Sequence, residues 1–449
     1  MSQSGVKDLT EGAIFKPLIR LAMPIMATGF IQVSHTLINM AWVGRLGSEH
    51  VAAVGGVGIL LWLTSSLALM TKVGAEISIA QCIGAKTLDK AGKYASHTIT
   101  IAVIMGLVIG IILNGASETI ISFYKLEEYI ANMANDYLKI ISFAMPMMFF
   151  SNTFTGIYNG TGRTSIPFYI IVFGLACNIL LDPLFIFTLN LGVEGAGYAT
   201  VLSQAIVAGL FIWQSKQKNG VLQNFPYFVK LQKSYTLHLF RLGAPIAVMN
   251  CFFAIIGFYI ARIASVYGGH LGVMCQSTGG QIEGITWTTS QGFATALGTF
   301  VAQNHAAGKI ERTWKAYRYT LSVLLALGVV VTAAFLLFGK EIFGVFVPEH
   351  QARIAGGEYL FIAAFSQIFM MIEITTFGMW NGFGRTIPPA VISIILNVAR
   401  IPFALWMAQL YGVNGVWIAI TISAIIKGIV SPAWFQLSLK PSGKLKVEN

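Results

Sequence analysis

The chain has 449 residues, of which 55% are hydrophobic and only 10% are charged, whereas a soluble domain carries roughly 25% charged residues. With a mean hydropathy of +0.71, this composition excludes an ordinary soluble enzyme. The formal charge of +11 is also found in nucleic-acid-binding proteins. The placement of the basic residues explains it better, and we expect no nucleic-acid partner.

Twelve apolar segments are long enough to cross a hydrocarbon layer of about 30 Å as helices. The predicted spans are residues 17–43, 51–82, 95–115, 137–158, 166–190, 193–213, 240–267, 272–303, 317–339, 359–380, 388–410 and 415–437. The N-terminal stretch 1–16 is polar and lacks a small-residue cleavage site, so we expect no removable signal peptide. The polar stretch 214–238 predicts a boundary between two six-helix domains, residues 1–222 and 223–449.

Basic residues gather in alternate connections between the predicted spans. They cluster between residues 86 and 93, 216 and 233, 309 and 318, and 440 and 446. The intervening connections carry most of the acids, namely Glu49, Glu118, Glu127, Glu128, Glu341, Glu349 and Glu358. Because the Lys and Arg bias sets the orientation of a membrane protein, we expect the basic connections and both termini on the cytoplasmic side.

Sequence signals for metal binding and catalysis are missing. The cysteines Cys82, Cys177, Cys251 and Cys275 form no CxxC pair, so we predict reduced, packed thiols rather than disulfides or a zinc site. No HExxH helix, Walker loop, G-x-S-x-G elbow or dinucleotide fingerprint is evident. We therefore expect neither an enzyme nor an ATP-driven pump, and no cofactor.

The two halves of the chain repeat each other. IRLAMP at 19–24 returns as FRLGAP at 240–245, and Ala-Gln at 80–81 returns at 302–303. NGTGRT at 159–164 returns as NGFGRT at 381–386, and GVEG at 192–195 returns as GVNG at 412–415. All four pairs are displaced by about 220 residues. Six helices per half give both halves the same orientation, which is typical of transporters built from parallel repeats.

These motifs resemble the MATE (multidrug and toxic compound extrusion) family over essentially the whole chain. The resemblance also rests on WVGRLG at 42–47, GAEISIAQ at 74–81 and NILLDP at 178–183. It implies an all-α polytopic membrane protein with twelve transmembrane helices in two pseudo-symmetric six-helix lobes arranged as a V. It further implies a monomeric antiporter in the bacterial inner membrane that exports organic drugs or toxins in exchange for H⁺ or Na⁺.

Two other functions stay open at this stage. A flippase for lipid-linked oligosaccharide has a related two-lobe architecture and needs cations to hold pyrophosphate. The ionisable residues in the predicted spans are mainly acidic, although Arg262, Arg400 and Lys427 keep this alternative open. A membrane scaffold without transport would leave the buried acids unexplained, because such residues are expensive in lipid and usually functional.

Asp182 is the sharpest candidate for ion or proton coupling. Asn178 precedes it by four residues, which places both on one face of the span 166–190. In the second half, the matching stretch NVARIP at 397–402 has no acid at this position, so the shared fold does not need it. In the span 17–43, Gln32, His35 and Asn39 form one polar stripe that we expect to meet Asp182.

The resemblance adds two expectations for this site. Similar family members combine a carboxylate from the first span with the Asn and Asp of the fifth. Here Asn39 stands where the family usually has Asp, so His35, with an ordinary pKa near neutrality, is a candidate substitute. Thr200 is expected to complete the set as a hydroxyl donor.

The remaining candidates concern the substrate cavity. Glu373 is expected to attract a cationic substrate or an ion, with a structural contact as the alternative, and Glu283 divides evenly between the two roles. Gln32, Met148 and Met370 are expected to line an adaptable wall, because flexible thioethers accept varied apolar cations, unless the methionines merely pack. For Glu76, an i, i+4 pairing with Lys72 is favoured over a cytoplasmic gate.

Overall fold

The computed structural model describes residues 6–123, 127–217 and 225–438, and this part of the chain contains helices but no strands. The predicted domain boundary at 222/223 lies outside the described residues. So do Lys218, Lys440, Lys444 and Lys446, which contributed to the predicted orientation.

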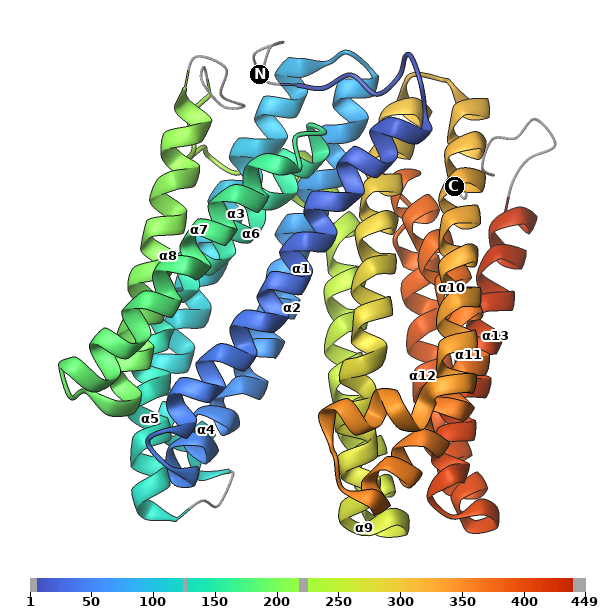
Figure 1. The fold of residues 1–449 in the computed structure, drawn as a ribbon. Coiled ribbons are helices and arrows are strands. Elements are labelled where there is room, and N and C mark those ends of the chain that lie inside the picture. Colours follow the sequence, from blue (N-terminus) through green and yellow to red (C-terminus); the bar gives the residue numbers. More distant parts are fainter. Residues whose placement is uncertain (1–5, 124–126, 218–224, 439–449) are drawn as a thin grey trace. The chain divides into compact units, whose positions relative to one another are not determined.

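The described residues of the first half form eight α-helices and one π-helical turn (Figure 1): α1 (Phe15–Gly44), α2 (Ser48–Gly84), α3 (Leu88–Gly115), α4 (Ser117–Ser122), α5 (Glu128–Ser142), α6 (Met145–Gly160), α7 (Ser165–Pro183), η2 (Leu184–Thr188) and α8 (Gly192–Lys216). The second half contains α9 (Lys233–Ala306), α10 (Ile310–Phe346), α11 (His350–Gly382), α12 (Ile387–Tyr411) and α13 (Val413–Leu437).

These helices account for the predicted spans. Ten helices in the described residues are long and apolar enough to cross a membrane, and the bent pair α5–α6 brings the number to eleven. Helix α9 has 74 residues, about 110 Å of helix, which is far too long for one crossing. Gly269 interrupts it with φ 56° and ψ −145°, so α9 is two spans, as predicted for 240–267 and 272–303. The prediction of twelve spans is confirmed.

The prediction of one continuous helix over 137–158 is wrong. The chain bends by 51° between α5 and α6. Pro146 lies in the first turn of α6, where its fixed φ is compatible with a helix start and its missing N–H is not needed. The break therefore has a local sequence cause that the apolar pattern conceals.

The chain folds into two compact units. Unit 1 comprises Met1–Leu9 and Ala27–Ala247, and unit 2 comprises Thr10–Met26 and Val248–Asn449. In unit 1, the buried rings of Phe154, Tyr158 and Phe211 form part of one apolar core. Each of the long helices α1 and α9 thus divides between the two units shortly after its proline, Pro24 or Pro245.

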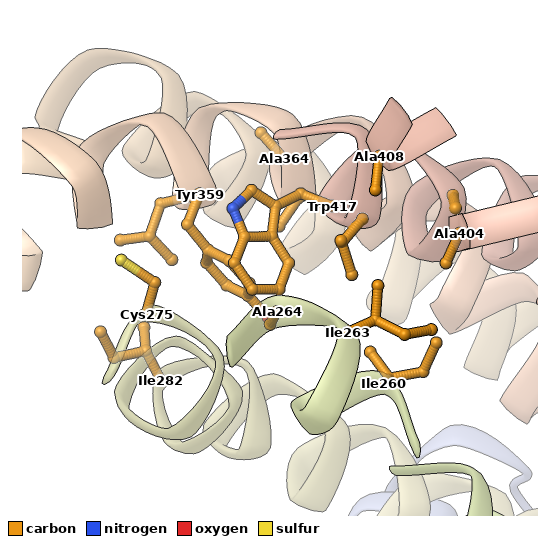
Figure 2. Packing of buried hydrophobic residues seen from close by; sticks show 14 of the residues in the cluster. Ile260, Ile263, Ala264, Cys275, Ile282, Tyr359, Ala364, Ala404, Ala408 and Trp417 are labelled. Atoms are coloured by element: carbon orange, nitrogen blue, oxygen red, sulfur yellow. The ribbon is translucent and has the colours of Figure 1, made fainter. Parts of the chain in front are cut away.

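The core of unit 2 fixes α11 against α13. The rings of Tyr359 on α11 and Trp417 on α13 meet edge to face, with centroids 4.8 Å apart. Figure 2 shows Ala264, Ala364 and Ala408 around this aromatic pair. Because these side chains are small, neighbouring helices can approach closely. The same two helices carry the ionisable side chains described below.

A Gly-x-x-x-Gly motif joins helices in both units. On α6 the glycines are Gly156 and Gly160, and a Cβ added to Gly160 would lie 2.6 Å from the carbonyl oxygen of Glu76 on α2. On α11 the motif begins at Gly378, where an added Cβ would lie 2.5 Å from the carbonyl oxygen of Ala294 on α9. Only glycine permits backbones this close, as in packed membrane helices generally.

The described part of the connection before α9 is folded against α3. Ser96 Oγ donates to the Pro226 carbonyl at 2.5 Å, and Thr100 Oγ1 donates to the Tyr227 carbonyl at 3.3 Å. The amide of Val229 donates back to Thr100 Oγ1 at 3.2 Å. These bonds satisfy backbone groups that would otherwise lack partners, so residues 225–229 are an ordered part of unit 1.

Candidate functional site

The backbone is irregular immediately after Asp182. Pro183 ends α7, and the π-helical turn η2 follows directly. Proline has no N–H to donate to the carbonyl four residues earlier, and single π-helical turns are frequent at functional sites. Asp182 is therefore located at a break in the ordinary helical hydrogen bonding.

Asn178 connects α1 to Asp182. Its Nδ2 donates to Asp182 Oδ1 at 3.2 Å. Its Oδ1 accepts from Asn39 Nδ2 at 3.3 Å and also from His35 Nε2. The polar stripe of the first span thus meets the acid-bearing helix through one amide, as predicted. We call His35, Asn39, Asn178 and Asp182 the unit 1 cluster.

The unit 1 cluster contains two buried oxygens that receive no hydrogen bond. Asp182 and Asn178 are each only 1% exposed. Within the described residues, Asp182 Oδ2 and Asn39 Oδ1 have no hydrogen-bond partner. Tyr137, on α5, is buried and close enough to Asp182 for an electrostatic interaction. An unsatisfied buried carboxylate oxygen is unfavourable, so this site is chemically poised to accept a proton or a cation.

Thr200, a predicted member, does not join the cluster, and Gln32 is exposed. The hydroxyl of Thr200, on α8, donates to the Ala196 carbonyl one turn earlier at 2.9 Å. The expected bond from Thr200 to the cluster is therefore not formed, because the hydroxyl is satisfied by its own helix. Gln32 is exposed on α1, and its carbonyl accepts from Thr36 Oγ1 at 3.1 Å.

A second group of ionisable side chains is buried in unit 2. Glu373, on α11, and Lys427, on α13, form an ion pair of 3.1 Å between Oε1 and Nζ. Glu373 is 4% exposed and Lys427 is 7% exposed. The sequence analysis gave Glu373 a role in the cavity, with a structural contact as the alternative. The structure shows such a contact, with Lys427.

Glu283, on α9, accepts hydrogen bonds at both carboxylate oxygens. Tyr359 donates its hydroxyl to Oε1 at 2.5 Å, and Gln367 donates Nε2 to Oε2 at 2.9 Å. Gln367 in turn accepts from Thr286 Oγ1 at 3.0 Å. Glu283 is therefore held rigidly, which favours the structural side of its predicted dual role.

Arg400, on α12, lies near both Glu283 and Glu373. The charges of Glu373 and Glu283 both act on its guanidinium, and its Nη2 donates to Ser423 Oγ at 3.3 Å. Its buried Nε and the buried Oδ1 of Asn397 lack partners among the described residues. We call Glu283, Glu373, Arg400 and Lys427 the unit 2 cluster.

The comparison with known families decides the classification. The profile of the MatE family matches residues 24–184 and, separately, residues 245–406. These matches cover most of the chain, and they repeat with the displacement found in the sequence. The chain belongs to the MATE family. It is accordingly a multi-pass membrane protein of a transporter family, not of an enzyme family.

Relatives of this MATE chain cover nearly its whole length. It is 26% identical over 436 residues to "Probable multidrug resistance protein NorM" of Thermotoga maritima, covering 94% of this chain and 92% of the relative. It is 23% identical to "Multidrug export protein MepA" of Staphylococcus haemolyticus, covering 93% of each.

Solved structures show the same fold. The structure titled "Crystal structure of MATE in complex with MaL6" gives a TM-score of 0.89 at 24% identity, covering 97% of this chain and 98% of that chain. The structure titled "Reverse polarity of binding pocket suggests different function of a MOP superfamily transporter", from Pyrococcus furiosus, gives 0.86 at 24% identity, covering 97% of each. The predicted two-lobed, twelve-helix fold is confirmed.

The structure gives the surroundings of the other predicted residues of this MATE chain. Met148 packs against a buried cluster of unit 1, and Met370 is half-buried on α11. Glu76 accepts from Asn159 Nδ2 at 3.4 Å and interacts electrostatically with Lys72. All four cysteines are free thiols, as predicted. The described residues contain no group of three or more His, Cys, Asp or Glu side chains arranged to hold a metal ion.

Some partners in the two clusters were missed at the sequence level. The sequence did not predict polar roles for Tyr137 and Tyr359, because an aromatic residue in an apolar span is expected to pack against other apolar side chains. Lys427 was noted as a buried cation, but nothing local connects it to Glu373, 54 positions earlier. Only the fact that a charged side chain in lipid needs a partner points to such a pairing.

Proposed function

We propose that this protein is a secondary antiporter that exports organic, cationic or amphipathic compounds in exchange for protons by alternating access. The names of both relatives, which state multidrug resistance or export, support the substrate class. The observation that carries the coupling mechanism is the unit 1 cluster. There Asp182 is buried with one oxygen held by Asn178 and the other unpartnered among the described residues.

In this mechanism Asp182 alternates between an ionised and a protonated form. A proton bound at Oδ2 removes the charge that is expensive to bury. A ligand shifts a conformational equilibrium only through its different affinity for the two states. Asp182 therefore biases the protein between outward-open and inward-open forms, provided that its carboxyl binds the proton more strongly in one of them.

The hydrogen bonds around Asn178 favour a proton over sodium. A hard cation such as Na⁺ would need several oxygen ligands, by analogy with other hard cations. The Asn178 oxygen already accepts from Asn39 and His35, and its NH₂ group points toward Asp182. This arrangement offers a cation one free carboxylate oxygen and the amide oxygen of Asn39, whereas a proton needs only one acceptor.

The expected membrane is the bacterial inner membrane, with both termini in the cytoplasm. The basic residues in the connections that begin near Lys86, Lys216 and Lys309 support this orientation.

Among similar solved structures, one is titled as MATE in the bent conformation and another as MATE in the straight conformation, with TM-scores of 0.90 and 0.88. Alternate states are thus known for that fold.

The test is efflux of a fluorescent organic cation from proteoliposomes, with a pH gradient and a sodium gradient imposed separately. Wild-type protein is expected to respond to the pH gradient, and Asp182→Asn to lose at least 90% of that response. Asp136→Asn, which removes an exposed acid from α5, is the matched control and should transport normally. Full gradient-dependent efflux by Asp182→Asn would refute the coupling role, and a response to sodium alone would refute proton coupling.

A flippase for lipid-linked oligosaccharide stays the alternative function. The buried cations Arg400 and Lys427 would suit a pyrophosphate, but the unit 2 cluster already balances them with Glu283 and Glu373. The same vesicles, supplied with a labelled lipid-linked sugar in place of the cation, would separate the two. Movement of the lipid without movement of the cation would establish the flippase instead.

A further inference from the structure

The ion pair between Glu373 and Lys427 is buried where lipid is the solvent. Both residues lie well inside candidate membrane spans, α11 and α13, and Nζ and Oε1 are 3.1 Å apart. Removing two charges from water costs free energy of desolvation. Their mutual attraction offsets this cost only when the geometry of the pair is good. A charged pair in this position therefore calls for an explanation beyond stability.

The fold itself does not require this pair. At the displacement that relates NGTGRT at 159–164 to NGFGRT at 381–386, Glu373 corresponds to Ser151. At the displacement that relates GVEG at 192–195 to GVNG at 412–415, Lys427 corresponds to Val207. The first half thus builds the same helices with a small hydroxyl and an apolar side chain at these positions.

The two acids of the unit 2 cluster are held differently. Glu283 receives neutral donors at both oxygens, from Tyr359 and Gln367. Glu373 forms an ion pair with the ammonium of Lys427, at the end of a long and flexible side chain. Glu373 is therefore the acid that is held by a charged partner on a flexible side chain.

The charges around the pair sum to zero only when Lys427 is included. The facing ionisable groups are Glu283 on α9, Tyr359 on α11 and Arg400 on α12, and the charges of Glu373 and Glu283 both act on Arg400. With Tyr359 neutral, two carboxylates oppose one guanidinium and one ammonium. Without Lys427 the cluster would hold one uncompensated negative charge at Glu373.

We propose that Lys427 is a built-in counter-cation, whose ammonium occupies the position that a dissolved monovalent cation such as Na⁺ would otherwise take at Glu373. The structure of unit 2 then needs no sodium, and Lys427 sets the ion specificity of this lobe. This inference extends the proposed function, since it accounts for transport without sodium. Its test measures stability, and so it can fail independently of any transport result.

The experiment is thermal unfolding of the purified protein in detergent, with NaCl or choline chloride at equal ionic strength. Lys427→Met keeps an unbranched side chain, one atom shorter, and removes the charge. It is expected to lower the Tm by about 5 °C in choline chloride, because an unpaired buried carboxylate is strongly destabilising. Most of that loss should be recovered at about 150 mM NaCl, where Na⁺ replaces the ammonium.

The matched control is the double variant Lys427→Met with Glu373→Gln, which removes both charges. Replacing both members of a buried pair is often nearly neutral, so its Tm should be close to that of the wild type and equal in the two salts. Lys427→Arg retains the charge and should likewise show no dependence on sodium.

Two results would overturn the proposal. One is a Lys427→Met protein whose Tm is the same in sodium and choline, whether or not it varies with pH, because Na⁺ would then not replace the ammonium. The other uses only proteins expected to be well folded: a sodium-specific rise in the Tm of the wild type that is absent from the double variant would mean that Lys427 leaves the position open.

Discussion

Asn178 is the residue on which the geometry of the unit 1 cluster depends. Its side-chain amide both donates and accepts hydrogen bonds. The NH₂ group donates to Asp182, and the oxygen accepts from His35 and Asn39 on α1. A side chain that connects three polar groups inside an apolar lobe cannot be lost without leaving several of them unsatisfied. Asn178 therefore positions the proposed coupling acid and also connects α1 to α7.

Asn178→Ala is accordingly expected to reduce pH-driven efflux by about tenfold, the equivalent of one hydrogen bond of about 1.4 kcal/mol. Efflux is measured in the proteoliposomes described above, with Asn132→Ala, an exposed position on α5, as control. Because both residues act through one cluster, the double variant with Asp182→Asn should transport no worse than Asp182→Asn alone. Wild-type rates for Asn178→Ala would contradict the positioning role.

The sequence predicted this cluster where contacts follow helical spacing. The interval of four residues placed Asn178 and Asp182 on one face, and the intervals of three and four defined the stripe containing His35 and Asn39. Thr200 could not be predicted in the same way, since a hydroxyl can bond its own helix as readily as a neighbour. Long-range pairs such as Glu373 with Lys427 leave no local pattern at all.

At the scale of helices, close packing depends on the repeated Gly-x-x-x-Gly motif of α6 and α11. The same motif occurs at equivalent positions in both halves, and on each helix it faces a backbone carbonyl of a neighbouring long helix, α2 or α9. The repeated segments quoted in the sequence analysis contain only the second glycine of each motif, Gly160 and Gly382. The sequence does not show which helix packs against a glycine, however, so a glycine in a span indicates only local flexibility.

Gly156→Ala tests this packing. The added Cβ would lie 2.9 Å from the carbonyl carbon of Lys72, so the helices must separate, and overpacking of this kind destabilises by about 1–3 kcal/mol. Gly209→Ala on α8 is the control, because its Cβ would meet nothing within 4 Å, and alanine favours a helix over glycine by about 1 kcal/mol. Thermal unfolding should therefore lower the Tm for Gly156→Ala alone, and equal Tm values would contradict the packing argument.

Helix boundaries were predicted less well than helix number. Apolar length located the spans, including the two that make up α9, but it could not show that 137–158 is broken at Pro146. This error concerns a single residue that changes the chain direction inside an apolar stretch. Hydropathy averages over about twenty residues and does not detect such a change.

At the scale of the whole molecule, the two halves share a fold but differ in charge. The family profile matches them at 24–184 and 245–406, yet the buried acid Asp182 has no counterpart in the second half, and Glu373 with Lys427 has none in the first. Duplication thus explains the helices, whereas the ionisable groups belong to each half separately. These groups are consequently where the function of each lobe is expected to differ.

An even number of spans places both termini on one side of the membrane, and in the proposed orientation the basic connections lie on that side, in the cytoplasm. Labelling with a membrane-impermeant maleimide tests this in a variant whose four native cysteines are replaced by serine. Lys90 and Glu127 are both exposed. Lys90 lies in the first turn of α3, and Glu127 lies beyond the other end of α3, between α4 and α5. In intact cells Glu127→Cys should react and Lys90→Cys should not. After permeabilisation both should react, because the difference then no longer depends on the membrane. The reverse pattern in intact cells would place the basic connections outside and contradict the export direction.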